Sequence, residues 1–319
     1  MTHEYRHIPV LLDECMEALN LHDGTVYLDC TLGGAGHSLE AASRIAPSGT
    51  LIGVDQDDMA LEAAAQRLGT VPLDSEPILL KGNFGDLDDL LLEARVPGID
   101  AVLFDLGVSS PQFDFPERGF SYREDAPLDM RMDPSTQTLN AAEIINTYNE
   151  ADLARVLRDY GDEKWAARIA RFVCDERRER PVETTFQLVD LIKRAIPAKA
   201  RRTGGHPAKR TFQALRVEVN HEMDVLRRGL DAAIRWLNPG GKIAVISYQS
   251  LEDKIVKEVF KKMQDPCTCP PDFPVCVCGK KPVLKVETRK PITPSAEEIE
   301  RNQRAHSARL RVATKLETN

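Results

Sequence analysis

The feature that most constrains the fold is a glycine-rich turn between a short apolar run and a segment with helical spacing. Residues 27–29 end in an acid, the turn contains Gly33, Gly34 and Gly36, and helical spacing begins at Ser38. Glycine adopts backbone angles closed to other residues and lets a ligand approach the main chain, and a helix start offers free N–H groups. The pattern predicts a strand, a turn and a helix. The turn is either a ligand site or purely structural.

A second acid favours the ligand site. The apolar run at residues 50–54 ends in Asp55, 19 positions after Gly36, where an acid accepts hydrogen bonds from ribose hydroxyls. The glycine spacing is not Gly-x-Gly-x-x-Gly, and no Walker Lys-Ser/Thr pair follows. This argues against a standard NAD fingerprint and against a phosphate-cradling loop. Methyltransferases that use S-adenosylmethionine share this layout, and their ligand carries a sulfonium and an amino acid tail.

Further apolar runs extend the pattern into an open sheet. Additional strands are expected at residues 50–55, 78–81 and 100–105, the last ending in Asp105. Helices are expected at residues 9–19, 57–68 and 85–95. Four strands separated by helices within about 105 residues predict an α/β fold with a mostly parallel sheet whose strand ends line one ligand crevice.

The pattern changes after residue 107. A long polar loop covers residues 107–133, helical spacing continues over residues 140–196, and a strand pattern returns only at residues 242–248, after a helix that ends at the Asn-Pro-Gly-Gly of residues 238–241. We therefore expect a helical module inserted between the fourth and fifth strands, with closing strands at 283–288 and 308–313. The expected domains are the first part of the sheet domain (1–110), an inserted helical RNA-recognition domain (111–214) and the second part of the sheet domain (215–319), with a Cys-rich loop at 266–282.

Charge is unevenly spread along the chain. The formal net charge of −8 argues against a nucleic acid partner for the chain as a whole, but residues 164–216 hold 14 Lys and Arg against 5 Asp and Glu. This basic segment either attracts phosphate or is a solvated helix surface. The 319 residues contain no run of 18 apolar residues, no signal-peptide pattern and an odd number of cysteines, 7. We expect a cytoplasmic protein with no membrane partner.

Four motifs in order give the chain a close resemblance to the MraW family, also called RsmH. They are GVSSPQ at residues 107–112, PLDMRMD at 127–133, HPAKRTFQALR at 206–216 and SLED at 250–253. The resemblance implies a class I, Rossmann-like methyltransferase with a helical insertion that uses S-adenosylmethionine. It implies methylation of the exocyclic N4 of one cytidine in the decoding region of 16S ribosomal RNA in the small ribosomal subunit. One departure is Tyr248-Gln249 before SLED, where the family usually has an aromatic residue and His.

The resemblance also implies site residues. The candidate cofactor-binding residues are Gly33, Ala35, Gly36, His37, Asp55, Phe84, Asp105 and Gln112. Asp55 is expected to bind the ribose and Phe84 to cover the adenine. The proton acceptor for the cytosine amine is expected to be Asp105, or a carbonyl or hydroxyl in the loop at residues 107–110. Separately from the resemblance, the basic cluster of the expected insertion supplies the candidate RNA-binding residues, which are Arg201, Arg202, His206, Lys209, Arg210 and Arg216.

Several alternatives stay open. Two C-x-C pairs are formed by Cys267, Cys269, Cys276 and Cys278. They either bind a metal or make a reduced or redox-labile loop. Metal binding stays open because zinc sites more often use C-x-x-C pairs. A non-catalytic adenosine-ligand or RNA-binding factor would keep the fold without turnover. A dehydrogenase with an aberrant glycine fingerprint is a second alternative, but it would give the basic insertion no role. Methylation of DNA or of a small molecule is a third, and it is less favoured because the insertion is basic and large. The sequence leaves homodimerisation open.

Overall fold

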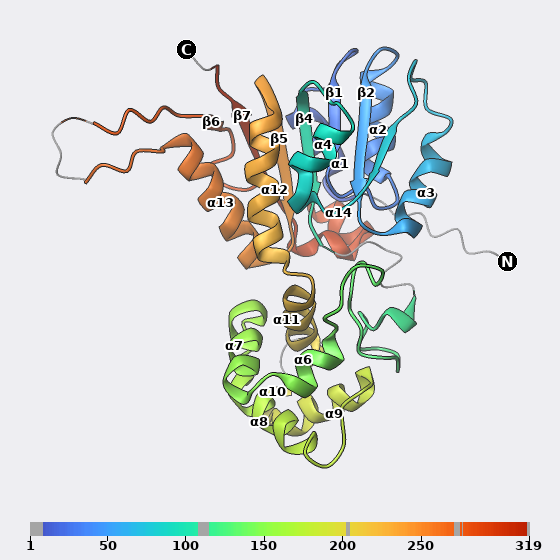
Figure 1. Cartoon of the computed structure of the whole chain (residues 1–319), viewed down its shortest axis with the longest axis vertical. Coiled ribbons are helices and arrows are strands. Elements are labelled where there is room, and N and C mark those ends of the chain that lie inside the picture. Colours follow the sequence, from blue (N-terminus) through green and yellow to red (C-terminus); the bar gives the residue numbers. More distant parts are fainter. Residues whose placement is uncertain (1–8, 108–114, 202–204, 271–274, 276, 318–319) are drawn as a thin grey trace. The chain divides into compact units, whose positions relative to one another are not determined.

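The computed structural model describes residues 9–107, 115–201, 205–270, 275 and 277–317. The chain divides into two compact units, which we call the sheet unit (Met1–Gly107 and Met223–Asn319) and the helical unit (Val108–Glu222). The sheet unit is thus discontinuous in sequence, and the helical unit is inserted between its two parts (Figure 1).

The described residues of the sheet unit form a seven-stranded sheet with the order β3-β2-β1-β4-β5-β7-β6 (Figure 1). Its strands are β1 (Val26–Asp29), β2 (Thr50–Asp55), β3 (Ile78–Lys81), β4 (Ile99–Asp105), β5 (Leu237–Ser247), β6 (Leu284–Val286) and β7 (Arg309–Lys315). The strands from β3 to β5 pair in parallel, whereas β7 is antiparallel to β5 and to β6. The mostly parallel sheet and the two closing strands expected from the sequence are confirmed.

The described residues of the sheet unit also form seven α-helices and two short 3-10 helices. They are α1 (Leu12–Leu19), α2 (Gly36–Ile45), α3 (Asp58–Leu68), α4 (Leu87–Glu93), α12 (Glu222–Trp236), α13 (Ser250–Gln264) and α14 (Ala296–Arg301), with the short 3-10 helices η1 (Phe84–Asp86) and η3 (Gln303–Ser307). Along β4, the consecutive residues Val102, Leu103 and Phe104 are all fully buried, although neighbouring side chains in a strand point to opposite faces. Both faces of the sheet are therefore covered, which explains why its strands are continuous apolar runs rather than alternating ones.

The chain reverses its direction of winding at β1. This strand pairs with β2 on one side and with β4 on the other, so that the next strands along the chain lie on opposite sides of it. In open parallel sheets such a reversal leaves a crevice at the carboxyl ends of the strands, and ligands bind there. Asp29, Asp55 and Asp105 are the last residues of the three strands concerned.

Some predicted ends of elements are wrong. The first helix begins at Leu12 rather than at residue 9, because Leu11 has φ 52° in the left-handed region. Helix α12 ends at Trp236, and the predicted stop signal from Asn238 to Gly241 lies within β5. The pairing of β4 with β5 shifts register between Ile99 and Ala101, and this irregularity accommodates the Pro and Gly residues in the strand.

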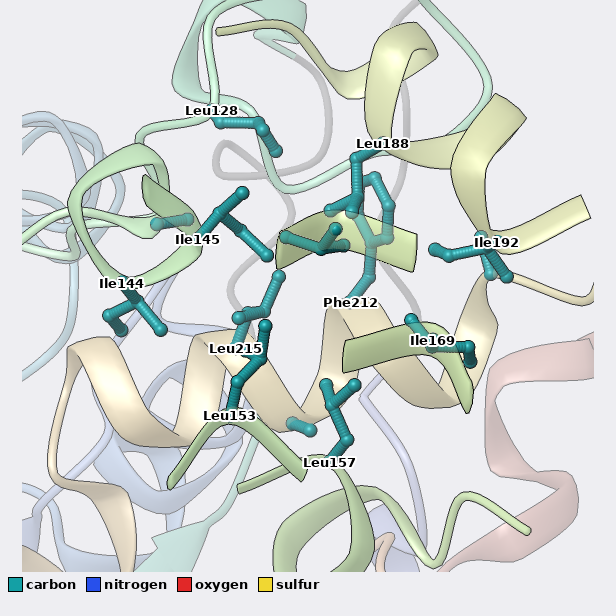
Figure 2. Packing of buried hydrophobic residues seen from close by; sticks show 14 of the residues in the cluster. Leu128, Ile144, Ile145, Leu153, Leu157, Ile169, Leu188, Ile192, Phe212 and Leu215 are labelled. Atoms are coloured by element: carbon teal, nitrogen blue, oxygen red, sulfur yellow. The ribbon is translucent and has the colours of Figure 1, made fainter. Parts of the chain in front are cut away.

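The helical unit has its own hydrophobic core (Figure 2). Its elements are η2 (Pro116–Arg118), α6 (Ala141–Thr147), α7 (Glu150–Gly161), α8 (Ala166–Glu176), α9 (Thr185–Ala195), α10 (Ala198–Arg201) and α11 (Lys209–Val219). Leu153 and Leu157 of α7, Ile169 of α8 and Phe212 and Leu215 of α11 point toward one another in Figure 2. Burying such a side chain contributes about 1.5–3 kcal/mol.

Local signals fix where these helices begin. Asn149 caps α7 and Thr184 forms a capping box with Gln187 at the start of α9, as expected for polar residues ahead of an apolar helix face. The helical unit extends to Glu222, past the expected boundary at residue 214, because Leu215 and Val219 belong to its core. None of the helices in the described part of the chain is long and apolar enough to cross a membrane.

Candidate functional site

The glycine turn lies between β1 and α2 and is pinned by two strand-end acids. Gly33 has φ 48°, in the left-handed region, and its N–H donates to Oδ2 of Asp55 at 2.8 Å. Asp29 accepts the hydroxyl of Ser38 at 2.7 Å and the N–H of Thr31 at 3.1 Å. The carboxylates of β1 and β2 therefore hold the turn in place, and glycine at position 33 is required by its backbone angle.

Ala35 stands at the start of α2 and has no side-chain oxygen to cap the helix. Its φ of 56° is left-handed, and no side-chain cap hydrogen bond is present. The first-turn N–H groups of α2, on Gly36 and His37, follow directly. A helix start of this kind binds a carboxylate because its N–H groups and dipole favour negative charge.

Glycine is required at position 36 by packing within the protein, which the glycine pattern of the sequence did not indicate. A Cβ atom at this position would lie 2.7 Å from Cγ of Pro9, well inside van der Waals contact. Glycine at position 36 therefore lets the segment before α1 pack against the turn. The close approach that the sequence suggested for a ligand is made here by the protein's own Pro9.

Asp55 is the predicted ribose-binding acid and lies partly exposed at the end of β2. Oδ1 accepts the N–H of Asp57 at 2.9 Å, and Oδ2 accepts the N–H of Gly33. Each carboxylate oxygen has two lone pairs, so one acceptor site remains on each oxygen for a hydroxyl. Burial raises the pKa of Asp55 to about 6, partly offset by these two backbone hydrogen bonds.

Asp105 ends β4 and faces two side chains from elsewhere in the fold. The hydroxyl of Tyr248 donates to Oδ1 at 2.7 Å, and Nδ1 of His37 lies 3.6 Å from Oδ2. The N–H of Asp105 donates to the hydroxyl of Thr31 at 2.6 Å. Burial raises the pKa of Asp105, while His37 and the Tyr248 hydrogen bond act in the opposite direction.

The ring of His37 is held at both nitrogens. Nε2 lies 3.0 Å from the carbonyl oxygen of Val10, which can only accept, so this nitrogen is the donor. Nδ1 lies 3.6 Å from Oδ2 of Asp105. The ring is therefore engaged within the protein, and the predicted cofactor contact of His37 stays a prediction.

Tyr248 and Gln249 explain the departure in front of SLED. Gln249 is the N-cap of α13 and forms a capping box with Glu252, so the imidazole common in the family is replaced by a side chain that caps the helix. Asp253 of the same motif pairs with Arg311 of β7 at 2.7 Å. The motif thus ties α13 to β7, and Glu252 also accepts the N–H of Tyr248 at 2.9 Å. Asp29 and Tyr248 are further candidate site residues that the sequence motifs did not reveal, although the strand-end position of Asp29 was a usable signal.

Phe84 follows β3 in η1 and is half-buried. Its ring meets Phe104 edge-on, with centroids 5.4 Å apart. Gly229 of α12 lies against it, since a Cβ there would approach Cδ2 of Phe84 to 2.6 Å. This packing holds the ring firmly, as required of an aromatic side chain that stacks on a base. Gln112, the remaining predicted cofactor residue, lies outside the described residues.

The predicted RNA-binding residues have different surroundings in the helical unit. Arg201 and Lys209 are exposed, and exposed Arg210 donates to the carbonyl oxygen of Asp162 at 2.7 Å. Arg216 is largely buried and forms a bidentate pair with Glu222 at 2.7 and 2.8 Å. This ion pair accounts for the charge of Arg216. Arg202 lies outside the described residues.

His206 lies in a pocket of about 380 Å³ that the sequence analysis did not foresee. Tyr122 stacks on its ring at 4.4 Å with an interplanar angle of 7°. Burial lowers the pKa of His206, and the charges of Lys193 and Arg123, which also line the pocket, act in the same direction. Phe186, which is 46% exposed, completes its apolar wall. Asp190 lines the pocket as well, so its charges are of both signs, and the stacked aromatic faces suit a nucleobase better than a phosphate.

Nearly the whole chain is similar to one family of proteins. A model of the MraW methylase family matches residues 4–316. The chain is 54% identical over 313 residues to the Ribosomal RNA small subunit methyltransferase H of Symbiobacterium thermophilum, covering 98% of each chain. It is 52% identical over 315 residues to the protein of the same name from Brevibacillus brevis, covering 99% of each chain. With a glycine turn and three strand-end acids at the carboxyl edge of its sheet, this chain belongs to the MraW methylase family.

Proposed function

We propose that this chain transfers the methyl group of S-adenosylmethionine to the exocyclic N4 of a cytidine in the decoding region of 16S ribosomal RNA. The proposal rests on one observation. The glycine turn lies beside Asp29, Asp55 and Asp105 at the carboxyl ends of the strands where the strand order reverses. Family membership directs this site to methyl transfer onto small-subunit ribosomal RNA. We further propose that the protein acts in the cytoplasm, where these subunits are assembled.

The residues at the sheet edge fit S-adenosylmethionine. Asp55 has an open acceptor site on each oxygen for the two ribose hydroxyls. The uncapped start of α2 offers N–H groups to the carboxylate of the amino acid tail. Phe84 is held to cover one face of the adenine. When bound, S-adenosylmethionine supplies a methyl group already activated by the adjacent sulfonium.

The reaction depends mainly on alignment. The cytosine amine is a poor nucleophile because its lone pair is delocalised into the ring. Holding the amine in line with the methyl group can lower the barrier by about 7–11 kcal/mol. As N4 forms its new bond to carbon it must lose a proton, and a positioned acceptor speeds this step.

Asp105 is the acceptor that we favour among the described residues, and residues 108–110 of the alternative loop lie outside them. Its Oδ1 is held by Tyr248, and its Oδ2 faces Nδ1 of His37. Burial raises the pKa of Asp105, which makes its carboxylate a stronger base than an exposed one. We assign Tyr248 the role of a positioning residue for the carboxylate of Asp105.

RNA recognition falls to the helical unit in this proposal. Arg201, Lys209 and Arg210 supply exposed positive charge, and the pocket beside His206 supplies aromatic surface. The target cytidine must leave its stack to reach the methyl group, and a pocket for a neighbouring base would help to hold the strand open. We leave Arg216 out of this surface because Glu222 already neutralises it.

The test measures transfer of a labelled methyl group from S-adenosylmethionine to small ribosomal subunits that lack the modification, with free ribosomal RNA in parallel. The expected product is labelled N4-methylcytidine. Asp105→Asn should retain cofactor affinity and lose most of its turnover. If Asp105→Asn keeps its turnover but loses cofactor affinity, Asp105 is a binding residue and not the proton acceptor. Tight cofactor binding with no transfer to either RNA would favour a non-catalytic factor.

A further inference from the structure

The connection between α13 and β6 lacks the usual sources of order. Residues 265–283 contain no helix or strand in their described part. At the base of this connection, the N–H of Val283 donates to the carbonyl oxygen of Met263 and the N–H of Val286 to Oε1 of Gln264, both at 2.8 Å. Farther out, Val275 and Val277 are 71% and 72% exposed, so these side chains form no buried core. Ordering the described residues of this connection costs conformational entropy, which a bound ion can offset.

Three thiols gather within this connection. The Sγ atoms of Cys267, Cys269 and Cys278 all lie within 4.8 Å of one another. The N–H of Val277 donates to Sγ of Cys269 at 3.3 Å, a contact that stabilises a thiolate. Residues 9 and 11 positions apart thus converge on one point, although no secondary structure brings them together. Cys276 lies outside the described residues.

The sulfur spacing matches metal coordination. The Sγ atoms of Cys267 and Cys278 are 3.9 Å apart. A disulfide would require about 2.05 Å. Two thiolates on one tetrahedral zinc ion, each with a bond of about 2.3 Å, are separated by about 3.8 Å. Thiolates are soft ligands that select zinc over magnesium or calcium.

We propose that Cys267, Cys269 and Cys278 supply three of the four ligands of one zinc ion, and that this ion joins the two ends of the connection between α13 and β6. A bound ion would tie the two halves of the connection together, as a hydrophobic core does in larger structures. The role is structural, because β6 is the edge strand of the sheet and three strands separate it from β1 and its glycine turn. Methyl transfer itself needs no metal.

The test is metal analysis of the untagged full-length protein, purified with a thiol reductant and without chelator. We expect one zinc per chain that survives gel filtration and is released when the thiols are modified by a mercurial. Cys269→Ala should lose the zinc, and limited proteolysis should then cut between residues 265 and 283. The control is Cys174→Ala, since Cys174 is buried on α8 in the helical unit. It should keep the zinc.

Three results would overturn the proposal. The first is substoichiometric zinc in the unaltered protein even after zinc is added and excess is removed. The second is equal zinc content in the Cys269→Ala and Cys174→Ala variants. The third is a disulfide among the cysteines of this connection in freshly prepared protein, detected by mass spectrometry. Cofactor affinity is measured on both variants to show that the sheet unit is folded.

Discussion

Cofactor affinity should weaken as the pH falls through about 6, because Asp55 is protonated there. Burial raises the pKa of this carboxyl from 3.8 to about 6. Ribose hydroxyls donate hydrogen bonds, so they bind the ionised form. A group with this pKa is roughly 90% ionised at pH 7 and roughly 10% at pH 5, which predicts an increase in Kd of roughly tenfold, or about 1.4 kcal/mol. With the ordinary pKa of 3.8 the change would be negligible.

The assay is calorimetric titration with S-adenosylhomocysteine between pH 5 and pH 8. Asp55→Asn removes the titrating group while keeping the side-chain shape, so its affinity should no longer depend on the ionisation of position 55. At pH 7 the variant should bind more weakly by about 1.5–3 kcal/mol, roughly tenfold to a hundredfold in Kd, because hydrogen bonds to a charged acceptor are lost.

The matched control is Asp58→Asn. Asp58 is exposed at the start of α3 and pairs with Lys81 at 2.6 Å. The substitution therefore removes the same charge from the same neighbourhood without changing a residue of the site. It should retain both affinity and pH dependence. If Asp55→Asn shows the same tenfold change with pH as the unaltered protein, another group is responsible and the role of Asp55 is refuted.

Three further predictions concern separate parts of the chain. Tyr248→Phe removes a donor that stabilises ionised Asp105, so the acid limb of the pH–rate profile should move to higher pH and kcat should fall roughly tenfold, with little change in KM. Gly36→Ala forces a Cβ against Pro9 and should lower the free energy of unfolding by about 1–3 kcal/mol, measured by urea denaturation. Lys209→Ala should weaken RNA binding, and reduce its salt dependence by roughly 0.7–0.9 in log–log slope, without changing cofactor affinity.

Two of these predictions have a control variant on the same unit. Gly34→Ala places a Cβ 3.4 Å from the flexible end of Arg67 and should cost less than Gly36→Ala. Arg158→Ala removes an exposed charge of the helical unit, one already paired with Asp159, and should affect RNA binding less than Lys209→Ala. Equal loss of RNA and cofactor binding in Lys209→Ala would indicate misfolding. An unmoved pH profile in Tyr248→Phe would contradict its coupling to Asp105.

Short-range patterns in the sequence determined much of the fold. The apolar runs that end in Asp29, Asp55 and Asp105 are the strands β1, β2 and β4, and the chain order of strand, turn and helix follows from them. These features depend on backbone angles and on the periodicity of burial over a few residues, which any segment carries in its own sequence. The helical insertion was visible for the same reason. The exact helix ends were not, because a single left-handed residue such as Leu11 decides them.

Contacts between distant parts of the chain could not be predicted from the sequence. Tyr248 lies 143 positions from Asp105 along the chain, and the two come together because β5 pairs beside β4. The contact of Gly36 with Pro9, the pairing of Arg216 with Glu222 and the convergence of the three cysteines arose in the same way. Such contacts follow from the packing of whole elements, which depends on interactions summed over the complete chain. The sequence therefore determined which residue types the site contains, and the packing determined which of them act on one another.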